Sequence, residues 1–159
     1  MVAVMVALSG TASSADTASN LKFLIGTWTL VTADVLRTDG TQAHDYGESP
    51  KGTMLIDAKG RYSIQIFKSE RPNFAAGDKS KGTPAEYEAA VMGSSTHFGT
   101  ISVDAANHVL IFSIEGSSYK NLEGTQQKRP YELQGDELTW RVPPRNDGSI
   151  PITTWKRVK

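Results

Sequence analysis

The chain has 159 residues, the length of one ordinary domain, and a chain of this length buries about two thirds of its unfolded surface without covalent staples. It contains no cysteine, which excludes disulfides, thiolate metal ligands and thiol nucleophiles. Its 17 basic residues balance its 17 acidic residues, so no net charge favours nucleic acid or an anionic membrane surface as a partner.

The N-terminal segment, residues 1–15, differs in composition from everything after it. An apolar run over residues 2–8 is followed by small residues at Ser13 and Ala15, the pattern of a signal-peptidase site with cleavage after Ala15. The run is too short to span a bilayer, and no Lys or Arg precedes it. We therefore expect a signal peptide or a disordered leader, export to the periplasm or medium, and a folded domain over residues 16–159.

After one short helical turn at residues 21–25, the sequence predicts short strands joined by turns. Tyr62, Ile64 and Ile66 alternate with polar residues, which is typical of a half-buried strand. The predicted strands cover residues 28–36, 53–57, 61–67, 97–103, 108–115, 123–133, 137–142 and 150–158. About eight strands at this spacing are typical of an all-β barrel or sandwich.

One helix interrupts the strands. Thr83 is a suitable N-cap, Pro84 suits the first helical position and Glu86 completes a capping box, so the sequence predicts a helix over residues 84–92. The preceding segment, residues 68–82, is charged and contains glycine and proline, which predicts a long loop.

The apolar face of this helix carries Tyr87, Ala90 and Val91. A helix this short is marginal alone and depends on packing. We therefore expect the helix and the loop before it to form a lid over the open end of a barrel, with Tyr87 near His97.

The first predicted strand opens on Trp28, in the triplet Gly-Thr-Trp, and the last closes on Arg157, in the triplet Trp-Lys-Arg. This pairing resembles the lipocalin signature, in which a tryptophan plugs the barrel floor and a cation from the last strand packs over it. The resemblance to the bacterial and fungal lipocalin-like domain family extends over residues 21–157, on the segments 24–31, 39–40, 46–47, 50–52, 60–63, 71–72, 83–86, 98–100, 124–125 and 129.

This resemblance implies an antiparallel β-barrel of about eight strands, with Trp28 and Arg157 in contact, and it implies a function only loosely. Members of the family often carry histidines on the strand that here spans residues 110–115. Phe112 and Ser113 stand there instead, which argues against histidine-dependent chemistry on that strand.

The sequence predicts no metal site and no cofactor. The histidines, His44, His97 and His108, show no spacing typical of metal ligands, and we expect His44 and His108 to be solvated. Haem bound through His97 has no second supporting feature. No Gly-x-Ser-x-Gly elbow is present to support nucleophilic catalysis.

Strand alternation predicts which ionisable side chains line the interior. If Trp28 points inward, strict alternation along its strand brings Asp34 inward too, and His97 and Arg129 are the other candidates. A buried arginine must be paired, so we expect Arg129 to meet a carboxylate such as Glu115 or Asp34. That pair either holds the barrel in register or orients a ligand, and for His97 too both interpretations stay open.

Two functions fit this interior. The first is binding of a small, mostly apolar or amphipathic molecule by a monomer or small homo-oligomer, with contacts from Tyr46, Tyr62, Tyr87, His97, Phe112, Arg129 and Trp140. The second is a cofactor-free isomerase, cyclase or lyase in which His97 or Asp34 moves a proton and Arg129 or a tyrosine stabilises the developing charge. We favour binding narrowly, because no proton-transfer pair is visible from the spacing.

Overall fold

Short turns join most of the strands, and most strands pair with the one before them in the chain. Gly60 and Gly135 stand in two of these turns at positive φ (76° and 61°), where a residue with a side chain is disfavoured. The computed structural model describes residues 21–159, and its strands are β1 (Gly26–Leu36), β2 (Gln42–Ala43), β3 (Lys51–Ile56), β4 (Arg61–Phe67), β5 (Ser94–Asp104), β6 (Val109–Ser117), β7 (Gln126–Gln134), β8 (Glu137–Arg141) and β9 (Ile150–Arg157).

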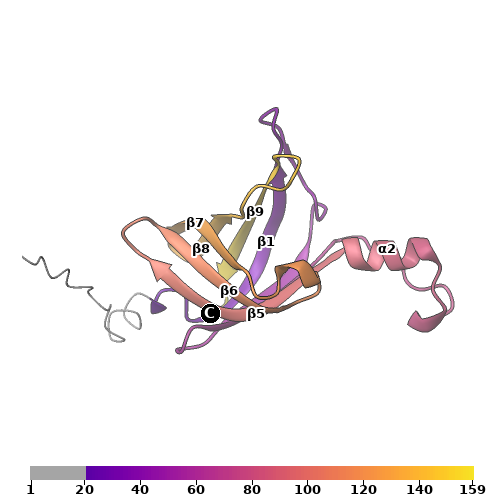
Figure 1. Cartoon of the computed structure of the whole chain (residues 1–159), viewed down its shortest axis with the longest axis horizontal. Helices are drawn as coiled ribbons and strands as arrows, with labels where there is room; N and C mark the ends of the chain where they lie inside the picture. The colour runs from indigo at the N-terminus through magenta and orange to yellow at the C-terminus, as the bar shows by residue number, and fades with distance from the viewer. Residues whose placement is uncertain (1–20) are drawn as a thin grey trace, which may run out of the picture.

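The sheet closes on itself because β1 pairs with β3 along its first four residues and with β9 along most of its length. All the pairings are antiparallel, and β2 adds only two residues beside the far end of β1. The predicted eight-stranded antiparallel barrel is therefore confirmed (Figure 1). Closure leaves the main strands without the unpaired edges that promote aggregation.

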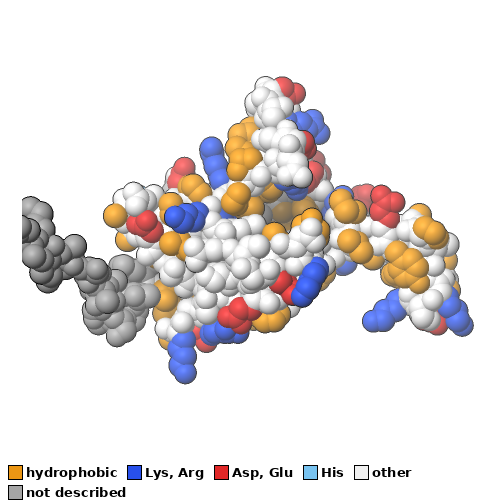
Figure 2. Space-filling view, in the orientation of Figure 1, with side chains coloured by type: hydrophobic (Ala, Val, Ile, Leu, Met, Phe, Trp, Pro, Cys, Tyr) orange, Lys and Arg blue, Asp and Glu red, His pale blue; other side chains and the backbone are white. Residues whose placement is uncertain are grey.

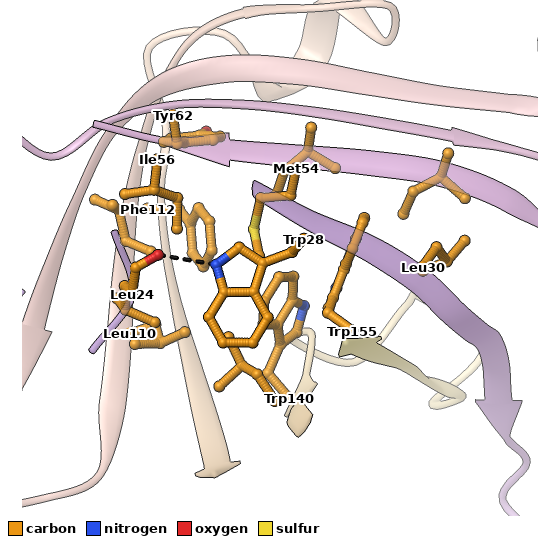
Figure 3. Packing of buried hydrophobic residues seen from close by; sticks show 14 of the residues in the cluster. Leu24, Trp28, Leu30, Met54, Ile56, Tyr62, Leu110, Phe112, Trp140 and Trp155 are labelled. Carbon is orange, nitrogen blue, oxygen red and sulfur yellow. Dashed lines mark hydrogen bonds between the residues drawn. The ribbon is translucent and has the colours of Figure 1, made fainter. Parts of the chain in front are cut away.

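Trp28 plugs one end of the barrel, which we call the floor. Its side chain is fully buried, and its Nε1 donates to the carbonyl oxygen of Leu24 over 2.9 Å (Figure 3). The guanidinium carbon of Arg157 lies 4.2 Å from the centroid of the Trp28 ring, and the same guanidinium donates to the carbonyl oxygens of Ile25 and Phe23. The predicted contact between Trp28 and Arg157 is confirmed.

Aromatic side chains fill the interior above the floor. The rings of Trp140 and Trp155 are stacked with centroids 5.6 Å apart, and the ring of Phe112 lies 5.5 Å from that of Trp140 (Figure 3). Leu110 and Leu138 are also fully buried among them. Hydrophobic burial at this packed centre is the main source of the barrel's stability.

The helix α2 (Pro84–Met92) forms with the predicted bounds and the predicted capping box at Thr83. It does not cover the barrel, as the predicted lid would, but extends away from it (Figure 1). We call this extension the arm. It comprises residues 68–93 and includes the short helix η1 (Lys79–Lys81). No residue of α2 is buried, and hydrophobic side chains lie exposed along the arm (Figure 2). Val91 and Met92 are 66% and 65% exposed.

The expected contact between Tyr87 and His97 is therefore wrong. The ring of Tyr87 packs on that of Phe74 at 5.6 Å, and its hydroxyl accepts a hydrogen bond from the amide of Gly82 over 3.0 Å. The helix thus finds its packing partner in its own loop, and this contact replaces the predicted contact with the barrel.

The expected leader, residues 1–15, lies outside the described residues, so its cleavage and the export of the protein stay predictions. Within residues 21–159 no helix is both long enough and apolar enough to cross a membrane.

Candidate functional site

Five neighbouring strands, β4 to β8, bring polar and aromatic side chains together inside the barrel. Antiparallel register sets His97 on β5 opposite Ile64 on β4, and it sets Leu110 on β6 opposite Arg129 on β7. We call the group that results the Arg129 cluster, and it consists of Tyr62, His97, Phe112, Gln127, Arg129 and Trp140. Apart from Gln127, its members were predicted from strand alternation.

Arg129 is the charged centre of this cluster and is only 4% exposed. Its guanidinium carbon lies 4.1 Å from the ring centroid of Phe112 and 5.6 Å from that of Trp140, so the cation rests between aromatic faces. Its Nη2 and Nε donate to Oε1 of Gln127 over 2.7 and 3.2 Å. Burial lowers the pKa of Arg129 to about 10, which leaves the side chain charged at neutral pH.

His97 lies between Arg129 and Tyr62 and is 7% exposed. Its Nε2 is 3.3 Å from Nη2 of Arg129, and its Nδ1 is 2.8 Å from the hydroxyl of Tyr62. Burial, together with the positive charge of Arg129, lowers the pKa of His97 to about 3. The imidazole is therefore neutral at physiological pH.

Tyr62 completes the hydrogen-bonded chain. Its ring meets those of Phe112 and His97 edge-on, with centroids 4.9 and 5.3 Å away. Burial raises the pKa of Tyr62 to about 12, so its hydroxyl keeps its proton over the physiological range.

The expected carboxylate partner of Arg129 is absent from the described residues. Glu115 lies on the outer surface and pairs with Arg61 over 2.6 Å, and the partner that Arg129 has instead is the amide oxygen of Gln127. Gln127 was missed, although it shares a face of its strand with Arg129 and the alternation that selected Arg129 also selects it.

Asp34 also departs from the prediction, because a β-bulge interrupts β1 between Leu30 and Thr32. One extra residue reverses the alternation beyond it, so that Ala33 joins the core and Asp34 faces out of the barrel. There the Asp34 carboxylate meets Nδ1 of His44 at 2.9 Å and accepts from Nε2 of Gln42 over 2.7 Å.

This placement removes Asp34 from the interior in which the enzymatic alternative needs it. Asp34 and His97 lie on opposite faces of the barrel wall and do not form a proton-transfer pair. His44 and His108 are exposed as expected, and the hydrogen bond with Asp34 raises the pKa of His44.

The end of the barrel opposite Trp28 is the open end, where the connections β1–β2, β4–β5, β6–β7 and β8–β9 gather. Three half-buried apolar side chains pack against the core here, those of Tyr46, Leu122 and Val142. Burial raises the pKa of Tyr46. Figure 2 shows the surface hollowed beside the loops above β1 and β9, with hydrophobic side chains at the bottom of the hollow.

Two other depressions lie outside the interior. The larger, about 580 Å³, is lined by Ser63, Gln65 and Phe98, which face outward, so it is a groove on the outer wall of β4, β5 and β6. The smaller, about 330 Å³, lies at the rim beside the ion pair of Asp45 and Arg145. In the described part of the chain, no three His, Asp or Glu side chains gather as metal ligands would.

One similar solved structure is that of a lipocalin-like protein from Bacteroides uniformis ATCC 8492, which is 15% identical in sequence to this chain. The alignment covers 86% of this chain and 99% of that chain, with a TM-score of 0.44. A mutant of the fluorescent protein UnaG is 10% identical, with 87% and 98% covered and a TM-score of 0.39. Curated proteins give no match. The model of the lipocalin-like domain family matches residues 25–158. The chain therefore belongs to the lipocalin-like domain family.

Proposed function

We propose that the protein binds a small, mostly apolar molecule through the open end of its barrel, with the polar end of that molecule directed at the Arg129 cluster. The observation that carries this proposal is a buried cation held without a carboxylate partner in an otherwise apolar barrel interior. Binding sites of this kind combine apolar walls with a few fixed polar groups. Barrels of about eight strands are just wide enough for one small ligand.

The floor half of the barrel is filled by the packed tryptophans, so the ligand enters from the opposite end. Tyr46, Leu122 and Val142 provide apolar surface there, and Gln127 lies half-buried between that surface and Arg129. Because His97 and Arg129 are almost fully buried, a ligand that reaches them displaces the half-buried side chains above them.

A neutral apolar fluorophore, N-phenyl-1-naphthylamine, tests this proposal without involving any ligand charge. We expect saturable binding with an increase in probe fluorescence, and we expect Val142→Trp, which fills the open end, to weaken binding about tenfold or more. The matched control is Val31→Trp, at an exposed position on the outer face of β1, which should leave binding unchanged. Absence of saturable binding to the wild-type protein would contradict the proposal.

A further inference from the structure

The hydrogen-bond pattern of the Arg129 cluster fixes where its protons lie. A guanidinium only donates, so Nε2 of His97 must accept from Nη2 of Arg129. The single proton of the neutral imidazole is therefore on Nδ1, which donates to the hydroxyl oxygen of Tyr62. The hydroxyl hydrogen of Tyr62 is then left for another acceptor.

Other donors of the cluster are also unused. Within residues 21–159, Nη1 of Arg129 has no hydrogen-bond partner, and the buried Nε1 of Trp140 has none either. The amide oxygen of Gln127 accepts from Arg129, which leaves the NH₂ group of Gln127 as a further donor. The cluster thus has several donors without partners, while His97 Nε2 and Gln127 Oε1 are already engaged as acceptors.

Charge adds to this imbalance. No salt bridge joins Arg129 to any carboxylate in the described part of the chain, and the nearest titratable groups, His97 and Tyr62, are neutral at physiological pH. An isolated buried cation is costly, and protein interiors normally offset it with a paired anion. A ligand that supplies both negative charge and acceptor atoms corrects both deficits at once.

We infer that the ligand is an amphipathic anion, an apolar body that ends in a carboxylate or an ionised phenol or enol, and that its oxygen accepts from Nη1 of Arg129. This inference rests on the proposed function and names the chemical class of the ligand. The edge of the guanidinium formed by Nε and Nη2 is occupied by Gln127, so the anion approaches at Nη1. The ring faces of Phe112 and Trp140 hold the guanidinium in place for this contact.

Two probes with the same apolar chain test the inference, namely decanoate and its neutral amide, decanamide, each competing with N-phenyl-1-naphthylamine. We expect the wild-type protein to bind decanoate about tenfold or more tightly than decanamide, because charge-assisted hydrogen bonds are stronger than neutral ones. Arg129→Met should abolish this preference, because it should weaken decanoate binding far more than decanamide binding.

The matched control is Lys128→Met, which removes the same charge from the exposed neighbouring position on β7 and should keep the preference. The wild-type comparison needs no variant, so it decides the inference even where Arg129→Met fails to fold. Equal affinity for the two probes, or a preference that survives in Arg129→Met, overturns the inference alone. Failure of the wild-type protein to bind either probe or the naphthylamine overturns the proposed function together with it.

Discussion

Nη2 of Arg129 on β7 lies 3.3 Å from Nε2 of His97 on β5, inside the barrel and across the intervening strand β6. Because the guanidinium can only donate, this contact keeps the imidazole of His97 unprotonated at Nε2. Burial disfavours the charged imidazolium, and the positive charge of Arg129 disfavours it further, which is why the pKa of His97 falls to about 3.

The low pKa of His97 predicts a pH dependence of stability. In the unfolded chain the histidine titrates near 6.5, whereas in the folded barrel it titrates near 3. Between these values the unfolded state binds the extra proton, so the free energy of unfolding falls as pH falls, by at most about 1.4 kcal/mol per pH unit. Urea unfolding between about pH 4.5 and 6.5 should show a shallower slope in His97→Gln than in the wild type.

His44 is the control for this measurement, because the hydrogen bond with Asp34 raises its pKa. Its contribution to stability is fully present below its unfolded pKa and is lost only as pH rises above that value, so His44→Gln should leave the slope between about pH 4.5 and 6.5 nearly unchanged. The same slope in the wild type and in His97→Gln would show that His97 is not held neutral.

Arg157 at the floor and Arg129 in the interior should respond differently to replacement by methionine. Arg157 donates to two backbone carbonyls and lies over Trp28, so Arg157→Met should lower the free energy of unfolding by about 1–3 kcal/mol. Arg129 lacks an anionic partner, so Arg129→Met should leave that free energy unchanged or raise it by up to about 4 kcal/mol. Chemical denaturation measures both, and a large loss in Arg129→Met would indicate a structural role for this side chain.

Trp28 should be among the most costly residues to truncate, because it is fully buried against Leu24 and Arg157. Trp28→Ala should lower the free energy of unfolding by about 3–5 kcal/mol, the usual range for a buried tryptophan. Leu55→Ala, at a half-exposed position on the outer face of β3, should cost about 0.5 kcal/mol or less. Similar losses in the two variants would contradict the assignment of the floor.

The arm should be dispensable for folding. The amide of Lys68 donates to the carbonyl oxygen of Gly93 over 2.9 Å, so the ends of the arm already meet. A short turn can replace residues 71–91, which keeps the hydrogen bonds that Ser69 donates to the carbonyl oxygen of Tyr46. Since no residue of α2 is buried, this deletion should change the free energy of unfolding by about 1 kcal/mol or less and leave probe binding intact. Loss of binding in the deletion variant, or in Tyr87→Ala, would show that the arm closes over the open end in solution.

Sequence patterns predicted the fold well, since strand alternation and turn residues carry most of the information about a closed antiparallel barrel. The helix at residues 84–92 was predicted to the residue, because its capping box is a local signal. Its direction was predicted wrongly, because the contact of Tyr87 with Phe74 joins segments whose proximity no local pattern encodes.

The candidate site was predicted only in part, because strand alternation is a local signal whereas the contacts between strands are not. Alternation placed His97, Arg129 and Tyr62 inside the barrel, and the structure joins them by hydrogen bonds. The error at Asp34 comes from the bulge in β1, which reverses the side-chain direction and has no mark in the sequence. The partner of Arg129 could not be predicted, because pairing across strands depends on register.

The most direct test of ligand binding is to incubate the purified protein with an extract of its source cells, reisolate it, and identify retained small molecules by mass spectrometry. We expect the wild-type protein to retain an apolar molecule with one acidic group, and Arg129→Met to retain much less of it, while Lys128→Met retains it as the wild type does. Retention of no small molecule by the wild-type protein, or equal retention by Arg129→Met, would contradict the assignment of the Arg129 cluster as the binding site.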